Sequence, residues 1–329
     1  MTQRQDLDPT TLRVLPWLVA VGLFMEHLDI SILNTAIPVI AADLDTTALS
    51  LKAVLTSYTL ALAIFIPVSG WVADRYGTRR VFRVAVALFT IGSLLCGLST
   101  NLPMLIASRF LQGVGGSMMV PVGRIALLRA YPRSQMLTMM NFVVIPAMIA
   151  PLVGPFVGGA IVHLLPWRTI FFVNIPIGIA GWLLIRRYMP DFRDVLVTPL
   201  DKLGMVLFGS GIALLSYVLE VFGEHSWPPR EIALMFAVSI VLLIGYRWHA
   251  RHMAHPLLYL RLFAIRTFRI PVVGGFITRL GVGGMPFLLP LLYQVGLGYD
   301  PLEAGLLTTP LAVAAIGMAA LLMFAFMAF

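Results

Sequence analysis

The feature that most constrains this chain is a series of about ten long apolar runs spread over its 329 residues. A helix needs about 20 residues to cross a bilayer, whereas a transmembrane barrel strand needs only about 9–11. Backbone polar groups in lipid must also find partners within the segment, which a helix provides. The runs therefore predict an all-α fold, a polytopic transmembrane helix bundle. They are Trp17–Ile40, Val54–Ala73, Val81–Ser99, Met104–Ile125, Met136–Val162, Thr169–Ile185, Leu203–Phe222, Ile232–Trp248, Ile270–Tyr293 and Ala304–Phe329.

The composition agrees with a membrane protein and excludes a soluble one. Only 12% of the residues are charged and mean hydropathy is +0.92, whereas an average soluble domain carries about 25% charged residues. Cys96 is the single cysteine, which excludes an intrachain disulfide and a cysteine zinc site. We expect Cys96 to pack within its helix, and we expect no bound metal.

The basic residues are distributed unequally between the two sides of the predicted bundle. When sides alternate along the chain, one side collects only Lys52, Arg168 and Arg230, while Arg109 and Arg279 fall within runs. All other members of the 23 Lys and Arg residues lie on the side of the N-terminus. Cytoplasmic loops carry such an excess. The pattern predicts a cytoplasmic N-terminus, and it explains the net charge of +8 without nucleic acid binding.

The first run contains two acids, Glu26 and Asp29, that lie three residues apart and therefore share one helix face. A carboxylate at mid-membrane costs at least about 2.5 kcal/mol on insertion scales, and such residues usually face a bundle interior or a wet cavity. Arg109 and Gln112 lie in the fourth run. An arginine at that depth needs a carboxylate or a water path, so we expect it to contact Asp29 or Glu26.

This arrangement favours proton coupling. Burial stabilises the protonated form of a carboxyl group, and a nearby guanidinium stabilises the ionised form. If Arg109 approaches and withdraws during a conformational cycle, Asp29 can bind and release a proton. A static ion pair that fixes helix packing is the alternative, and Glu26 could contact a cationic substrate instead. Arg279 has no obvious partner in the sequence and could either line the same cavity or extend its side chain to the membrane surface.

Two further stretches suggest moving parts. "GWVADRYGTRR" joins the second and third runs and places Asp74 among basic residues beside a turn glycine, which is typical of a conformational latch or of simple positive-inside anchoring. "PLVGPFVGGAIV" in the fifth run has Gly154 and Gly158 on one face, a spacing that permits close helix packing. Pro155 removes a backbone hydrogen bond and favours a bend.

Taken together, these stretches resemble the major facilitator superfamily, specifically fourteen-helix drug:proton antiporters of the EmrB/QacA type and, among them, MdtD-like members. "LDISILNTAIP" resembles the first-helix signature of that family, and "WRTIFFVNIPIG" resembles the opening of its sixth helix. Val72, Thr78, Phe82 and Ala150 depart from the family patterns. The remaining motif matches are Gly70, Asp74, Arg75, Gly77 and Arg79 in the loop, Arg109, Gln112 and Gly113 in the fourth helix, and Gly154, Pro155, Gly158 and Gly159 in the fifth.

The resemblance implies three parts. Residues 1–188 would form an N-terminal six-helix half, residues 189–256 a linker with two additional central helices, and residues 257–329 the start of an incomplete C-terminal half. About ten spans of an expected fourteen are then present. We therefore expect a chain that is truncated at its C-terminus relative to the family.

The function implied by the resemblance is proton-coupled multidrug efflux across the bacterial inner membrane by alternating access. The partners would be protons, membrane lipid and small hydrophobic or cationic compounds. Transport would be driven by the proton gradient and would need no cofactor. The resemblance does not decide whether an accessory envelope protein takes part. The alternative is an inactive or partner-dependent fragment. No HExxH, GxSxG or GxxxxGK[ST] stretch is present, so neither a membrane-embedded enzyme nor ATP-driven transport is predicted.

The resemblance also assigns roles to residues. Asp29, Glu26 and Arg109 would couple the proton. The other expected positions are Asn34, Tyr58, Gln112 and Asn141 in the substrate cavity, Gly70, Asp74, Arg75, Gly77, Arg79 and Arg80 in the gating loop, and Gly154, Pro155, Gly158 and Gly159 in the antiporter helix.

Overall fold

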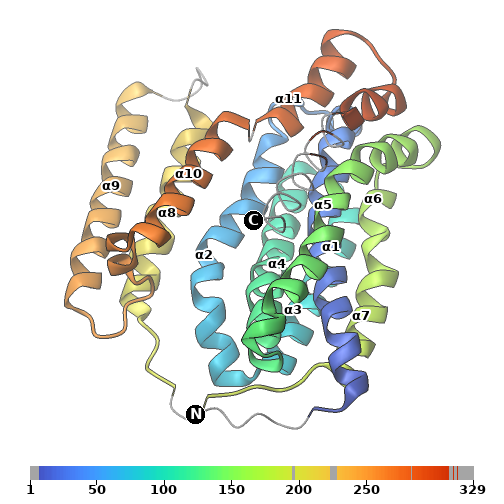
Figure 1. The fold of residues 1–329 in the computed structure, drawn as a ribbon. Coiled ribbons are helices and arrows are strands. Elements are labelled where there is room, and N and C mark those ends of the chain that lie inside the picture. The colour runs from blue at the N-terminus through green and yellow to red at the C-terminus, as the bar shows by residue number, and fades with distance from the viewer. Residues whose placement is uncertain are drawn as a thin grey trace.

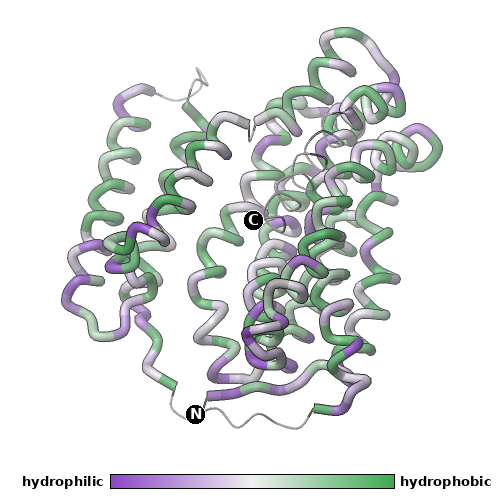
Figure 2. Tube along the Cα trace, in the orientation of Figure 1, coloured by the Kyte–Doolittle hydropathy of each residue, from purple (hydrophilic) through white to green (hydrophobic). Residues whose placement is uncertain are grey.

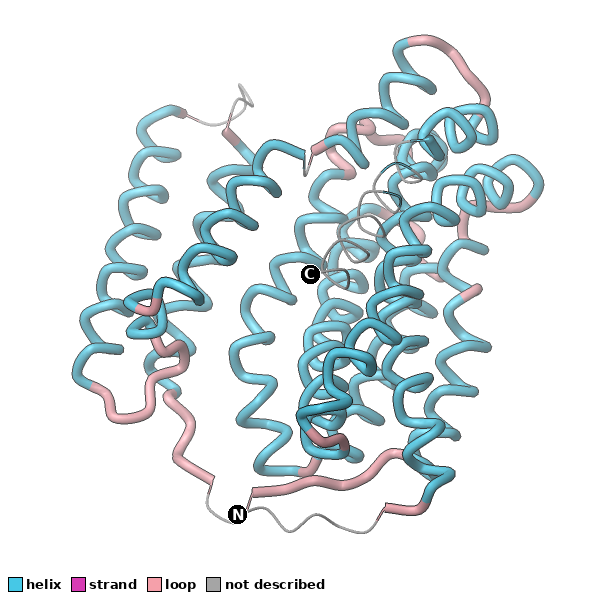
Figure 3. The backbone as a smooth tube through the Cα atoms, in the orientation of Figure 1, coloured by secondary structure: helices cyan, strands magenta, loops and turns pink. Residues whose placement is uncertain are grey.

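The computed structural model describes residues 7–194, 197–222, 228–282, 284–310, 314 and 317. Within these residues all regular secondary structure is helical (Figures 1 and 3), so the predicted all-α class is confirmed. Nine helices in the described part are long and apolar enough to cross a membrane. The helices are α1 (Pro9–Asp43), α2 (Lys52–Tyr76), α3 (Thr78–Gly97), α4 (Leu102–Ala130), α5 (Arg133–Leu164), α6 (Thr169–Phe172), α7 (Asn174–Tyr188), α8 (Lys202–Val221), α9 (Pro229–His252), the 3₁₀ helix η1 (Leu260–Ala264), α10 (Arg266–Val282), α11 (Met285–Leu291) and the π-helix η2 (Leu292–Gly296).

Two predicted runs are interrupted in the structure. The sixth run is divided at Val173 between α6 and α7, where Pro176 in the first turn of α7 lacks the N–H needed to continue the helix from α6. The ninth run is divided between α10 and α11 and continues into η2. Residues 304–310 of the tenth run belong to a helical stretch that begins at residue 301, and the rest of that run lies almost wholly outside the described residues.

Local chemistry explains several helix ends. Asn101 precedes α4, and its Oδ1 accepts a hydrogen bond from Met104 N at 2.9 Å, as expected of an N-cap. Asp201 precedes α8 and accepts from Gly204 N at 2.8 Å. Gly77 ends α2 with φ +88°, a left-handed conformation that glycine adopts without steric cost.

The N-terminal helices pack at very short range because glycines lie at their crossings. A Cβ at Gly92 of α3 would lie 2.6 Å from Gln112 Cα of α4, and one at Gly113 would lie 2.6 Å from Tyr58 O of α2. Such contacts allow backbones to approach closely, as small residues do in membrane bundles. They bring polar residues of α2, α3 and α4 into one buried layer.

Helices α8 and α9 form an antiparallel pair that stands beside the N-terminal group, with α8 against α2 (Figure 1). Asp201 connects the start of α8 to the end of α9 through hydrogen bonds. Its carboxylate accepts from Gly204 N, from Leu257 N at 3.2 Å and from His249 Nε2 at 2.7 Å. Burial by itself would raise the pKa of Asp201, but these hydrogen bonds and the nearby histidine together lower it.

At the far end of the bundle, where α1 ends and α2 begins, the N-terminal helices contact the segment that follows α10. Gln294 Nε2 donates to Thr35 O at 2.9 Å, and His163 Nδ1 lies 3.0 Å from Asp300 Oδ2. Figure 2 shows hydrophobic residues along the helix lengths, with hydrophilic residues gathered toward the ends and loops. The predicted division into 1–188, 189–256 and 257–329 stays a prediction.

Candidate functional site

Asp29 lies near the middle of α1 and is surrounded by hydrogen-bond donors. Arg109 Nη1 lies 2.5 Å from Asp29 Oδ2, while Gln112 Nε2 and Asn174 Nδ2 donate to Oδ1 at 3.0 Å and 2.8 Å. Asp29 is only 4% exposed. A buried carboxylate is tolerated when it is paired and hydrogen-bonded in this way. The site thus joins α1 to α4 and α7.

Arg109 is wholly buried, and its guanidinium has three kinds of neighbour. Besides Asp29, its Nη1 donates to Gln112 Oε1 at 2.7 Å, and its Cζ lies 4.5 Å from the centre of the Tyr58 ring. Its Nε and Nη2 have no hydrogen-bond partner within the described part of the chain. Unsatisfied buried donors cost about 1–3 kcal/mol each, so this arginine retains binding capacity that its contacts do not use.

Glu26 lies one turn before Asp29 and is 6% exposed. Of the two acids considered as partners for Arg109, the structure places Asp29 and not Glu26 against it. In the described residues, neither Glu26 Oε2 nor the Tyr58 hydroxyl has a hydrogen-bond partner. Gly116 leaves room beside that hydroxyl, because a Cβ there would lie 2.6 Å away from it.

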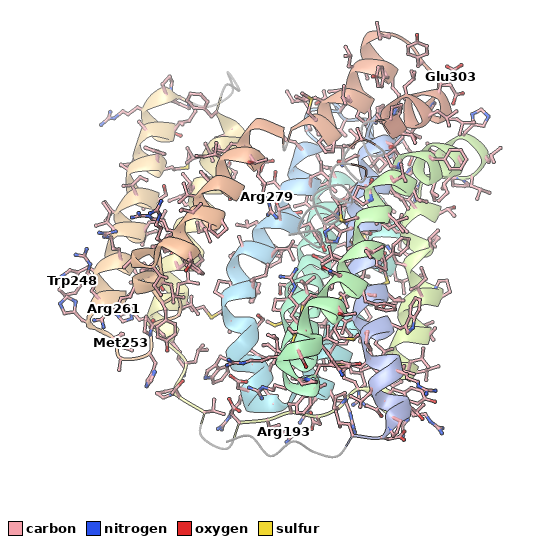
Figure 4. The ribbon with its side chains drawn as sticks, viewed as in Figure 1. Arg193, Trp248, Met253, Arg261, Arg279 and Glu303 are labelled. Carbon is pink, nitrogen blue, oxygen red and sulfur yellow. The ribbon has the colours of Figure 1, made fainter. Side chains whose placement is uncertain are left out.

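The other predicted cavity residues divide into two groups. Tyr58 and Gln112 belong to the Asp29–Arg109 layer. Asn34 is buried on α1 and Asn141 is half-buried on α5, and among the described side chains the hydrogen bonds to Asp29 come from Arg109, Gln112 and Asn174 instead. Arg279 is exposed on α10 (Figure 4) and is not one of the residues that contact Asp29.

Asn174 is the main residue of this site that sequence reasoning missed. Besides Asp29, its Nδ2 donates to Ser93 Oγ at 3.0 Å, and Ser93 Oγ donates to Phe171 O at 2.8 Å. Asn174 stands at the break between α6 and α7. A polar residue two positions before Pro176, inside an otherwise apolar run, is the signal that could have identified it.

At the connection between α2 and α3, which the sequence predicts to be a gating loop, Asp74 has a different partner from the one that the sequence suggests. Asp74 was expected to cluster with Arg75, Arg79 and Arg80, which are all exposed. The structure instead pairs Asp74 Oδ1 with Arg129 Nη2 of α4 at 2.8 Å.

The segment after α7 completes the surroundings of this loop. Asp194 Oδ2 lies 3.2 Å from Arg129 Nη2, Arg79 N donates to Asp191 Oδ1 at 3.3 Å, and Arg79 Nε donates to Met189 O. Gly77 packs against the Asp191 carboxylate so closely that a Cβ at this position would overlap with Asp191 Oδ1. Gly70 lies on α2 with open space beside it. The sequence had not assigned a role to Arg129, Asp191 or Asp194.

The glycines of α5 face two neighbours. Gly154 lies against Ser31, and a Cβ at Gly158 would lie 2.8 Å from Ile32 O, so both face α1. A Cβ at Gly159 would lie 2.5 Å from Pro301 O, and Pro155 O lies against Gly305. One short stretch of α5 therefore packs against α1 within the N-terminal group and against residues 301–305.

Comparisons with known proteins match this architecture. The family model described as Major Facilitator Superfamily matches residues 19–329. A protein of Serratia proteamaculans (strain 568) named "Putative multidrug resistance protein MdtD" is 42% identical over 302 residues, which cover 92% of this chain and 63% of the relative. A relative of the same name from Shigella flexneri serotype 5b is 41% identical over 310 residues, or 94% of this chain and 66% of its own length. The chain thus spans slightly less than two thirds of these curated relatives.

Solved structures support the fold. The crystal structure of a D-xylose-proton symporter aligns with a TM-score of 0.65 and 14% identity, covering 97% of this chain and 70% of the symporter. A peptide transporter POT in complex with sulfate aligns with a TM-score of 0.64 and 16% identity, again covering 97% of this chain and 70% of that one.

Proposed function

Because this chain belongs to the major facilitator superfamily, we propose that it performs proton-coupled export of small hydrophobic or cationic compounds by alternating access. The observation that carries this proposal is the buried Asp29–Arg109 pair, 2.5 Å apart within a helix bundle. Intramembrane ionisable residues are expensive and typically mark ion or substrate pathways. The MdtD relatives carry a multidrug resistance name, which supports the proposed class of substrate.

In the proposed cycle, Asp29 carries the proton. A proton that reaches Asp29 removes the negative charge that holds Arg109, so the arginine is left with Gln112 and the faces of the Tyr58 and Phe171 rings. Loss of the proton restores the ion pair. Asn174 donates to Asp29 Oδ1, the carboxylate oxygen that Arg109 does not contact, and so connects the charge state of Asp29 to the α6–α7 break. A membrane potential of 100 mV supplies about 2.3 kcal/mol for each charge moved, so the proton gradient takes the place of a cofactor.

Glu26 is proposed to receive the cationic part of a substrate or a second proton. Its carboxyl oxygen, the Tyr58 hydroxyl and two Arg109 nitrogens are buried without partners among the described residues. They form a polar patch in apolar surroundings, which is the common character of small-molecule sites. Asn34 and Asn141 remain proposed members of a larger cavity.

Movement between states is proposed to use both ends of the bundle. The far end is closed by two contacts, Gln294 with Thr35 and His163 with Asp300. Gly159 and Pro155 of α5 pack closely against residues 301–305 at the same end. At the opposite end of the bundle, where α2 ends and α3 begins, Asp74 is proposed to act with Arg129 and with the loop residues Gly77, Arg75, Arg79 and Arg80. We call this end the near end. We assign the near end to the cytoplasm of a bacterial cell, with the chain in the inner membrane.

Reconstituted vesicles test this function. The chain in vesicles with an acidic lumen should accumulate a fluorescent hydrophobic cation, and Asp29→Asn should abolish the accumulation. Asp43→Asn is the matched control, because Asp43 ends the same helix and pairs with Arg168 at 2.9 Å. Uptake that survives Asp29→Asn would contradict proton coupling by Asp29. A wild-type chain without gradient-driven uptake would favour the inactive or partner-dependent alternative.

A further inference from the structure

A hollow of about 280 Å³ lies at the C-terminal end of α9. Three arginines line it. Arg247 and Arg251 lie four residues apart on α9 and so share one face of the helix, while Arg261 comes from η1. Figure 4 shows Arg261 beside Met253 and Trp248 at this end of the molecule.

Within the part of the chain that the structure describes, the arginines of the hollow are not paired with an anionic side chain. In the described residues none of the three forms an ion pair or a side-chain hydrogen bond. Between residues 228 and 282 the sequence has one acid, Glu231, in the first turn at the opposite end of α9. Asp201, at the base of the same helix pair, is buried and already accepts from His249. Like charges around one hollow repel each other, and an anion would relieve that repulsion.

Apolar and aromatic side chains, including Met253, Tyr259 and Leu260, line the same hollow, and Trp248 follows Arg247 on α9. Trp248 is 68% exposed, Tyr259 52% and Met253 42%. No residue of η1 is buried, as expected of the interfacial segment that the mixed apolar and basic sequence from Pro256 to Arg269 suggests. Aromatic side chains gather at membrane–water interfaces because one part prefers lipid and the other water.

We propose that this hollow binds the phosphate group of an anionic phospholipid. Guanidinium groups bind phosphate oxygens through paired N–H donors, and Arg247, Arg251 and Arg261 supply three of them around one space. Met253 and Tyr259, which also line the hollow, offer apolar and aromatic surface to the glycerol and upper acyl chain. The partial negative charge of the α9 C-terminus opposes an anion, so the arginines provide the attraction.

A phospholipid fits these observations better than a soluble phosphate compound. The hollow lies at the end of a helix long enough to cross the membrane, and apolar side chains border it. Clusters of basic residues directly beyond the cytoplasmic end of a transmembrane helix typically attract anionic lipid head groups. The proposal requires only that the chain is inserted in a membrane, so it stands or falls independently of transport.

Lipid binding to the purified full chain tests the proposal. Native mass spectrometry from detergent should show phosphatidylglycerol retained on the wild type and phosphatidylcholine lost. The triple variant Arg247→Gln, Arg251→Gln, Arg261→Gln should bind phosphatidylglycerol at least about tenfold more weakly. Arg13→Gln, Arg133→Gln, Arg186→Gln is the matched control, because it removes the same charge from three exposed arginines elsewhere and should bind as the wild type does.

Further arms separate the remaining outcomes. If the triple variant unfolds, Arg261→Gln alone provides the test. Arg261 lies on an exposed 3₁₀ helix, so this single variant should weaken lipid binding without a folding defect. Binding should fall as salt rises, because exposed charges are screened. Equal retention by the triple variant and the wild type, or equal retention of the two lipids, would overturn the proposal. If inorganic phosphate displaced the lipid at micromolar concentration, the hollow would be a site for a soluble anion, and the proposal of a lipid site would be overturned.

Discussion

Arg109 Nη1 and Asp29 Oδ2 lie 2.5 Å apart, and their side chains are 0% and 1% exposed. This ion pair joins α4 to α1, although the two residues are 80 positions apart in the sequence. Removing one member of such a buried pair leaves an uncompensated charge, which costs more than the pair itself contributes. The stability of the N-terminal helices should therefore depend on both residues together.

Arg109→Met should destabilise the protein by about 3–5 kcal/mol, because Asp29 would be left without its ionic partner. Adding Asp29→Leu should recover much of that loss, since no unpaired charge then remains. Unfolding in mixed detergent micelles measures both variants and the coupling between them. Additive losses in the double variant would show that the two side chains do not act as a pair.

Gly77→Ala should destabilise the near end by more than about 1 kcal/mol. Gly77 has φ +88°, and an added methyl group would meet the Asp191 carboxylate, so both backbone and side chain oppose the substitution. Gly70→Ala is the control on the same helix. It has nothing within 4 Å and should raise stability by up to about 1 kcal/mol through helix propensity. The same unfolding assay compares them, and equal effects would contradict the expectation.

Gly159→Ala should move α5 away from residues 301–302, because its methyl group would lie 2.5 Å from Pro301 O. Spin labels at Leu164 and Tyr299, both exposed, should then report a longer distance in a Cys96→Ala background. Gly158→Ala offers a comparison, since it faces Ile32 of α1 instead. That variant should lower stability without changing the label distance.

Asp201→Asn should destabilise the α8–α9 pair at neutral pH by about 1–2 kcal/mol, because charge-assisted hydrogen bonds become neutral ones. The pKa of Asp201 is lowered in the folded protein despite burial, through bonds from His249, Gly204 and Leu257. Its stabilisation is therefore present above the ordinary aspartate pKa and is lost as pH falls through the lower, folded value.

The difference between wild type and Asp201→Asn should accordingly shrink as the pH of the unfolding assay is lowered below about 4. Asp8→Asn is a useful control, because Asp8 also precedes a helix but its side chain forms no capping hydrogen bond. A difference for Asp201→Asn that stays constant with pH would mean that the carboxylate charge is not what stabilises this end.

Much of the fold could be predicted because it depends on local composition. Long apolar runs such as Val54–Ala73 and Met104–Ile125 form helices in lipid, here α2 and α4, because a helix satisfies the backbone polar groups within the segment. Pro176 is the eighth residue of the predicted run Thr169–Ile185, and it did not by itself predict the break at Val173, because a proline inside a helix can also bend the helix without dividing it.

The candidate site could be predicted only in part. Glu26, Asp29 and Arg109 are conspicuous because charge in an apolar run is costly, and one of the two contacts considered for Arg109 is present. Asn174 carries no charge and therefore gave a weak signal. The sequence also grouped Asp74 with its neighbouring arginines, although its partner is Arg129, 55 residues away.

The sequence by itself determined the helical class, the approximate span limits and the presence of costly charges inside them. Only the tertiary structure decided which of those charges meet, because a contact between helices depends on how each helix is rotated and how closely its glycines allow it to approach. Gly92 brings α3 against Gln112, and Gly113 brings α4 against Tyr58. Those approaches, which no single run encodes, place Asp29, Arg109, Gln112 and Asn174 within hydrogen-bonding distance.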